Sequence, residues 1–199
     1  MIAVTNRKLC TEPLEERVGR LASAGAEMVI LREKDLDDAR LTDIAVRCLD
    51  ACSRFNTPMA VNGNTRVARE LGIGRIHLQM DLMRAEDLGS FDTVGASIHC
   101  VAEAVEAEGL GADYLIAGHV FPTACKVGEP RGLGFLEDVC DSVDIPVYAI
   151  GGISPSNFEK VLSTGAAGAC IMSSAMKSDN PELLVSALTR NRNASSYKF

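Results

Sequence analysis

The segment from residue 117 to 133, AGHVFPTACKVGEPRGL, combines residue types that proton-transfer chemistry uses. His119 follows a short apolar run, and a polar loop containing Thr123 and Lys126 comes after it. Histidine has an ordinary pKa of about 6.5, so it can both accept and return a proton near neutral pH. We therefore expect His119 to act as a catalytic acid/base and Lys126 to contact an anionic substrate. A lone histidine without this loop would more often be structural.

Two further runs, AIGGI at 149–153 and IMSS at 171–174, have the composition of a phosphate cradle. The first ends in Gly151 and Gly152, and the second ends in Ser173 and Ser174. Backbone N–H groups and hydroxyls bind phosphate when neighbouring loops present them together. The pair predicts a phosphate site at these four residues. In the alternative interpretation, the glycines only allow two tight turns.

Other polar residues follow other apolar runs. Arg32 ends one run, where its guanidinium could bind an anion in a bidentate manner, and Asn62 ends another, where we expect it to contact substrate. Lys34 is better explained as a solvated charge at the start of a loop. The sequence leaves three residues without an assigned role: His77, His99 and Cys125.

These residues need a scaffold that brings them to one place, and the pattern of the chain predicts it. Short β-rich runs alternate with amphipathic segments that have helical periodicity. Several runs are apolar almost throughout, as in MVIL and VYAI, which indicates strands covered on both faces. Eight such strands are expected, at Ile2–Asn6, Met28–Arg32, Met59–Asn62, Arg75–Leu78, Thr93–Ser97, Asp113–Gly118, Val147–Ile150 and Gly168–Ile171.

Eight strand–helix units in 199 residues predict an α/β fold, a small (β/α)₈ TIM barrel made of a single domain. We place the domain at residues 1–190 and expect a poorly ordered tail at 191–199. A doubly wound open sheet is the alternative, since periodicity does not show closure. In a barrel, the residues after the strands meet at one face, where active sites lie.

Composition excludes several classes of partner. The chain carries 20 Lys and Arg against 27 Asp and Glu, a formal charge of −7 without a basic run, so we expect neither nucleic acid nor a membrane as partner. Without a signal-like or membrane-spanning segment, we expect a cytoplasmic protein.

The seven cysteines are scattered and odd in number, which favours free thiols. We assign no metal to them, although Cys48 and Cys52 lie one helical turn apart.

Seven segments together resemble a known family over nearly the whole chain. They are LREK, VNGN, RIHLQ, GASIH, ADYLIAGHVFPTACKVGEPRGLG, IPVYAIGGI and GAAGACIMSS. Their order and spacing are similar to those of the family that unites thiamine phosphate synthases with the thiazole tautomerases called TenI. The resemblance implies a TIM barrel that binds a small phosphorylated thiazole and, as is common for such barrels, forms a homo-oligomer.

The synthase branch joins hydroxymethylpyrimidine diphosphate to a thiazole phosphate and uses Mg²⁺. Its typical segments are QLREK, VNDD and HxGQxD, and this chain departs from each. Ile30 stands in place of the glutamine, Gly63 and Asn64 replace the acidic pair, and 77–81 reads HLQMD. Mg²⁺ prefers the hard carboxylate oxygens that are missing here.

The tautomerase branch fits better, because GHVF followed by T-x-C-K resembles its loop. There the histidine that matches His119 is the acid/base, and Pro130 is the one departure, standing where glycine is usual. The resemblance thus favours cofactor-independent aromatisation of a carboxythiazole ethyl phosphate. Two alternatives stay open: the Mg²⁺-dependent synthase, and a barrel that binds phosphate for regulation without catalysis.

Overall fold

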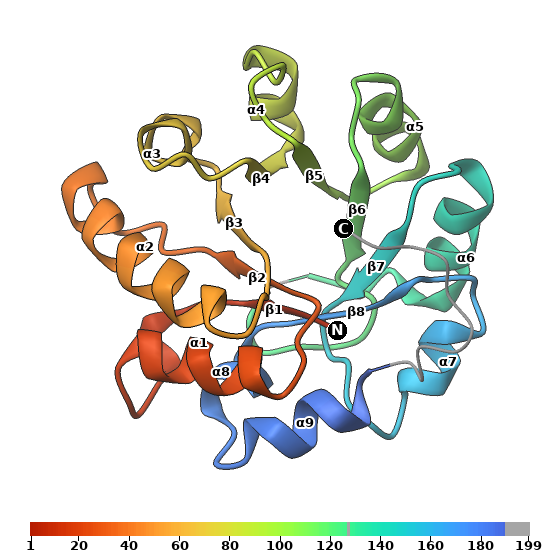
Figure 1. The fold of residues 1–199 in the computed structure, drawn as a ribbon. Coiled ribbons are helices and arrows are strands. Elements are labelled where there is room, and N and C mark those ends of the chain that lie inside the picture. Colours follow the sequence, from red (N-terminus) through yellow and green to blue (C-terminus); the bar gives the residue numbers. More distant parts are fainter. Residues whose placement is uncertain (127, 190–199) are drawn as a thin grey trace.

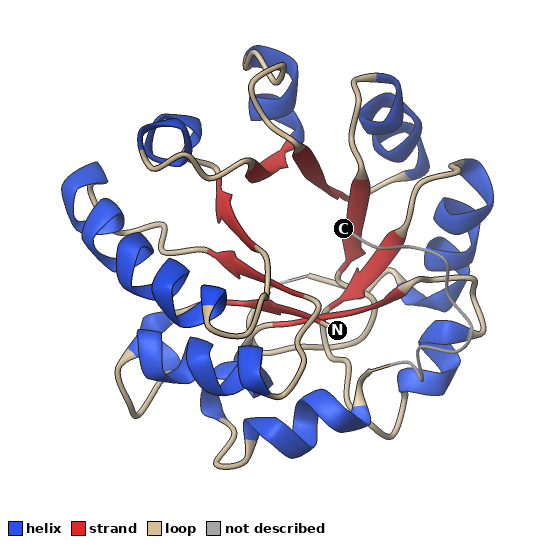
Figure 2. Ribbon diagram, in the orientation of Figure 1, coloured by secondary structure: helices blue, strands red, loops and turns tan. Residues whose placement is uncertain are grey.

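Eight parallel strands close into a barrel, in which each strand pairs with the next and β8 pairs with β1. The computed structural model describes residues 1–126 and 128–189. Figure 1 shows the ring of strands with the helices outside it, and Figure 2 shows the same alternation by colour. The strands are β1 Ile2–Val4, β2 Met28–Leu31, β3 Met59–Asn62, β4 Arg75–Gln79, β5 Thr93–Ile98, β6 Tyr114–Gly118, β7 Val147–Ile150 and β8 Gly168–Ile171.

A helix follows every strand along the chain. A short 3₁₀ turn, η1, covers Arg7–Leu9 after β1. The helices are α1 Leu14–Ser23, α2 Asp38–Ser53, α3 Thr65–Glu70, α4 Met80–Ala85, α5 Val101–Gly109, α6 Gly132–Ser142, α7 Phe158–Leu162, α8 Ser173–Lys177 and α9 Pro181–Ala187. The predicted TIM barrel is confirmed, and closure between β1 and β8 rules out the open sheet. The strand bounds agree with the sequence prediction to within two residues, and the predicted tail lies outside the described residues.

Two apolar layers stabilise the barrel, one on each face of the strands. Along β4, for example, Ile76 and Leu78 pack outward against the helices, whereas His77 between them faces the interior. A second, smaller cluster fills the inside of the barrel. Burial on both faces is the physical reason for the continuous apolar runs in the sequence.

Tyr114 is a large, fully buried side chain inside the barrel, and Gly95 on the neighbouring strand makes room for it. The two residues are partners in the β5–β6 register, and a Cβ added to Gly95 would lie 2.0 Å from the Tyr114 ring. The Tyr114 ring also packs edge-on against Tyr148, with 6.2 Å between the ring centroids. The absence of a side chain at Gly95 is therefore a packing requirement.

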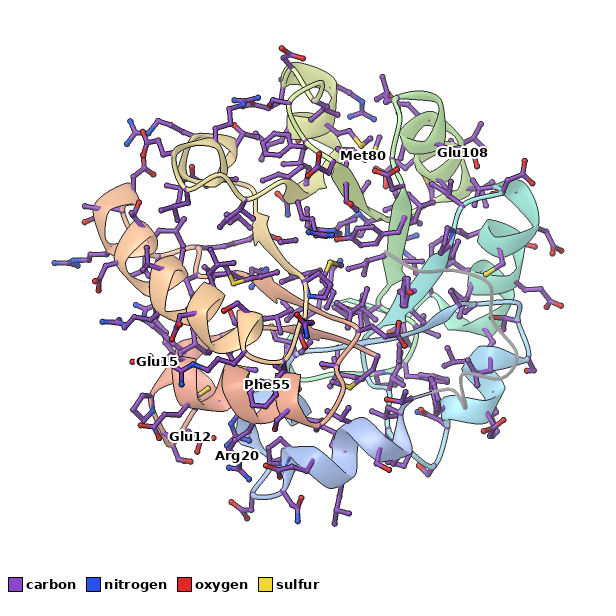
Figure 3. The ribbon with its side chains drawn as sticks, viewed as in Figure 1. Glu12, Glu15, Arg20, Phe55, Met80 and Glu108 are labelled. Atoms are coloured by element: carbon purple, nitrogen blue, oxygen red, sulfur yellow. The ribbon has the colours of Figure 1, made fainter. Side chains whose placement is uncertain are left out.

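Ion pairs on the outer surface join helices that are distant in sequence. Arg20 on α1 lies 3.2 Å from Glu12 and 2.8 Å from Glu182 on α9, and Figure 3 shows Glu12 and Arg20 on the outer side of α1.

The seven cysteines all lie in the described part and are free thiols, as predicted. Within that part, no helix is both long enough and apolar enough to cross a membrane.

Replacing Gly95 by Ala should lower the free energy of unfolding by about 1–3 kcal/mol, because the added Cβ would overlap the fully buried Tyr114 ring and force it to shift. Urea denaturation of the variant measures this change. Gly109→Ala at the end of α5 is the matched control, since its added Cβ would meet nothing within 4 Å. An unchanged midpoint for Gly95→Ala would contradict the packing argument.

Candidate active site at the carboxyl ends of the strands

A cavity of about 420 Å³ opens where the strands end. Its inner wall is apolar and includes Val4, Ile30 and Ile116, while polar side chains form its rim. The structure brings all eight predicted site residues to this one cavity, which is lined by Arg32, Asn62, His119, Lys126, Gly151, Gly152, Ser173 and Ser174. Their individual roles stay predictions, but their assembly from five strand ends is a property of the fold.

The paired glycines after β7 allow the chain after β6 to pass close by. Both have positive φ, +99° at Gly151 and +65° at Gly152. A Cβ on Gly151 would lie 2.3 Å from the Cβ of His119, and one on Gly152 would lie 2.5 Å from the carbonyl oxygen of Pro122. The N–H of Phe121 donates to the carbonyl of Gly151 at 3.1 Å. The glycines thus have the turn role of the alternative interpretation, and they also position His119.

His119 is held at the rim in a defined tautomer. The residue is 6% exposed, and its Nε2 lies 3.3 Å from the carbonyl oxygen of Gly128. A carbonyl oxygen can only accept, so Nε2 carries the hydrogen and Nδ1 is the nitrogen available to a substrate. The same loop is fastened to the histidine backbone, because the N–H of Arg131 donates to the His119 carbonyl at 2.9 Å.

A buried carboxylate, which the sequence did not single out, organises the end of β2. Glu33 accepts a hydrogen bond from the Thr5 hydroxyl at 2.7 Å and from the Arg7 guanidinium at 2.9 Å. The Thr5 oxygen in turn accepts the N–H of Arg32 at 2.9 Å. This network fixes the backbone that carries Arg32. Glu33 is occupied by these donors and does not line the cavity.

The rim of the cavity is cationic. Arg32, Lys34 and Lys126 line it, and none of its described lining residues is Asp or Glu. Partial burial, with a smaller contribution from Arg32, lowers the pKa of Lys34, which lies at the cavity rather than on a wholly solvated run. Partial burial also lowers the pKa of Lys126, with Arg131 adding to the effect. An anion placed here would relieve the repulsion between these charges.

The residues present do not fit a magnesium site. Asp81, the one acidic residue of its segment, has a 98% exposed side chain and lies 3.2 Å from Arg84. Asn64 caps α3 by accepting the N–H of Val67, and it donates to Asp38 at 2.7 Å. In the described ranges, no three His, Cys, Asp or Glu side chains come together as metal ligands. The cavity therefore offers cations, where Mg²⁺ would need carboxylates.

His77 lies inside the barrel below the rim. Its Nδ1 is 3.1 Å from the Tyr114 hydroxyl and its Nε2 is 2.8 Å from Oγ of Ser97. Burial, with a smaller effect from Arg32, lowers the pKa of His77 to about 3. The ring is therefore neutral at pH 7 and orients Ser97, which lines the cavity. His99 lies at the rim, and Cys125 is exposed in the loop above it.

A closed (β/α)₈ barrel with a cavity at the carboxyl ends of its strands defines the class, a TIM-barrel protein with a cationic mouth. The family model for thiamine monophosphate synthase (TMP-TENI) matches residues 1–175. The chain belongs to this family, and the resemblance found in the sequence is confirmed.

Named relatives agree with this assignment. The thiamine-phosphate synthase of Clostridium novyi is 34% identical over 173 residues, covering 84% of this chain and 85% of the relative. That of Enterococcus faecalis is 33% identical over 180 residues, covering 88% and 85%. The solved thiamine phosphate pyrophosphorylase of Pyrococcus furiosus superposes with a TM-score of 0.84 at 30% identity, covering 94% and 92%. These names match the synthase alternative rather than the tautomerase.

The depressed pKa of His77 predicts a pH dependence of stability. Between pH 6.5 and about 3 the unfolded chain binds a proton at His77 that the folded chain does not, so stability falls as pH falls. This one group contributes a slope of at most about 1.4 kcal/mol per pH unit. Urea titrations at several pH values should show a shallower slope for His77→Gln. A slope equal to that of the wild type would contradict the buried neutral state.

Proposed function

We propose that this protein is a thiazole tautomerase, which aromatises a carboxythiazole ethyl phosphate without a metal ion. The observation that carries the proposal is the chemistry of the cavity: three cations and one held histidine at the rim, with no carboxylate among its described lining residues. A substrate with two anionic ends suits such a cavity. An aromatising proton shift needs an acid/base but neither a leaving group nor a metal ion.

Each part of the substrate has a matching part of the cavity in this proposal. The phosphate takes the cradle of Gly151, Gly152, Ser173 and Ser174, and the carboxylate takes Arg32. The ring lies against the apolar wall, which excludes water from the reacting carbon atoms. Nδ1 of His119, the nitrogen not bonded to Gly128, faces the proton transfer. Asn62 and Lys126 complete the rim.

Thiamine phosphate synthesis is the second candidate, and the names printed for the relatives favour it. The synthase couples a pyrimidine diphosphate to a thiazole phosphate, and in this family it uses Mg²⁺. Both candidates place a thiazole phosphate in the same cradle. They differ in the group that must be bound beside it, and after β3 this chain has Gly63 and Asn64 in place of the acidic pair of the synthase segment.

One experiment separates the candidates. Purified protein is mixed with the dihydrothiazole carboxylate phosphate, and aromatisation is followed by absorbance. A parallel tube contains the pyrimidine diphosphate, thiazole phosphate and Mg²⁺. Aromatisation without metal supports the tautomerase, whereas thiamine phosphate in the second tube would overturn that assignment. Activity in neither tube would favour a non-catalytic phosphate-binding barrel. Formation of a homo-oligomer stays a prediction, testable by light scattering of the same sample.

Replacing His119 by Gln should lower kcat for aromatisation about 100- to 1,000-fold, because a positioned acid/base contributes about that much to a proton transfer. Substrate affinity should stay within about threefold, since the cradle and Arg32 are untouched. Cys100→Ser, an exposed position just before α5, is the control that should keep the wild-type rate. An unaltered rate in His119→Gln would remove the histidine from the mechanism.

A further inference from the structure

Arg17 on α1 is a buried cation in the helical layer of the barrel. Among the described residues it is the only Arg or Lys side chain that is buried, with 2% of its surface exposed. It is not one of the described residues that line the cavity. A buried guanidinium is unfavourable unless its donors find partners, so these partners indicate what the side chain holds in place.

The partners of Arg17 lie at the end of α8, the short helix that carries half of the phosphate cradle. Its Nη1 donates to the carbonyl oxygen of Ser178 at 2.6 Å and lies 3.4 Å from that of Ala175. The last carbonyl groups of a helix have no partner within the helix, and a cation is favourable beside them. Ser173 and Ser174 begin the same helix. Arg17 thus holds α8 at the end opposite to the cradle.

α8 depends on such contacts for its position. The helix has five residues, which is too short to be stable by itself. Met176 anchors its apolar side, since this residue is fully buried and its sulfur lies 3.5 Å from Sγ of Cys10. Apolar contacts are not directional, whereas the hydrogen bond from Arg17 to the Ser178 carbonyl fixes a direction.

The guanidinium of Arg17 is itself held by a network on the same face of α1. Oε1 of Glu12 lies 2.6 Å from Nε of Arg17 and 3.2 Å from Nη1 of Arg20. Arg20, one turn further along α1, donates from Nη2 to the carbonyl oxygen of Asp179 at 3.1 Å. The two arginines therefore bind consecutive carbonyl groups where α8 leads into α9, at Ser178 and Asp179.

A phosphate cradle binds tightly only if its donors are fixed before the ligand arrives. Gly151 and Gly152 form one half, and their turn is fixed by the hydrogen bond from Phe121 to the Gly151 carbonyl. Ser173 and Ser174 form the other half and move with α8 as a unit. A shift of α8 would carry both serines away from the glycines, which would weaken phosphate binding.

We infer that Arg17 is a positioning residue for phosphate binding, which acts through α8 on Ser173 and Ser174 and does not touch the ligand. The inference rests on the phosphate cradle of the function proposed above. It holds for any phosphate ester that this cradle binds, whichever reaction follows. Loss of Arg17 should weaken phosphate binding and leave proton transfer at His119 unaltered.

The first test is Arg17→Met, which keeps the apolar stem of the side chain and removes the donors to α8. The Kd for inorganic phosphate, measured by calorimetry, should rise about tenfold, roughly the loss of one hydrogen bond to a charged group. In the aromatisation assay, KM should rise by a similar factor while kcat stays within about twofold. An unchanged Kd would overturn the inference, and so would a lower kcat at an unchanged KM.

Val18→Ala is the matched control, because Val18 is the next residue of α1 and is fully buried in the apolar layer. It should lower the urea midpoint and keep the wild-type Kd, which separates lost stability from lost positioning. Arg17→Lys keeps the charge but not the planar fork, so its Kd should rise only about threefold. This milder variant carries the test if Arg17→Met does not fold, and a wild-type Kd would then overturn the inference.

A double-mutant cycle tests the route through α8. The cradle variant replaces Ser173 and Ser174 by Ala and should itself weaken phosphate binding about tenfold. If Arg17 acts through these serines, Arg17→Met should cost less than about threefold in the cradle variant. A full tenfold loss there would show that Arg17 acts elsewhere, and would overturn the proposed route.

The same measurements distinguish a failure of this inference from a failure of the cradle. A wild type that does not bind phosphate, or a cradle variant with the wild-type Kd, would overturn the cradle and the inference with it. A loss in the cradle variant without one in Arg17→Met would overturn the inference alone. Phosphate binding that depends on Arg17 in a protein without tautomerase activity would support the inference and overturn only the proposed reaction.

Discussion

The hydrogen bonds that join β8 to β1 are the constraint on which the rest of the molecule depends. Once a parallel sheet closes, every strand ends at the same rim, and residues far apart in the chain become neighbours there. Closure also makes an interior narrow enough for side chains to fill it. The space that Gly95 leaves for Tyr114 and the contact between Tyr114 and His77 follow from that narrowness.

The mouth of the barrel is positively charged, although the protein as a whole carries a net negative charge. The chain has a net charge of −7, yet Arg32, Lys34 and Lys126 gather around the cavity and the nearby carboxylates are engaged elsewhere. Glu33 is bonded to Thr5 and Arg7. A cationic cleft in an apolar setting focuses the field on an anionic ligand and attracts it from solution. The same positive charges disfavour the binding of Mg²⁺ at this site.

Family membership and site chemistry answer different questions here. The family model and the named relatives show a thiamine-related barrel. One scaffold can carry several reactions, and the activity depends on a few positions after the strands, such as Gly63 and Asn64 after β3. The rim carries His119, held by the carbonyl of Gly128, and the cations Arg32, Lys34 and Lys126, and these are the groups on which the proposed proton shift rests.

The sequence by itself determined the strands, their burial on both faces and the rim residues, because period, glycine caps and apolar runs are local signals. It did not determine closure, which is a pairing between the two ends of the sheet. Nor could it show that His77 faces inward and is neutral, that Thr5 and Glu33 fix the backbone at Arg32, or that Gly151 lies against His119. These are contacts between residues roughly 25 to 40 positions apart, and only tertiary packing brings such groups within bonding distance and sets the burial that shifts a pKa.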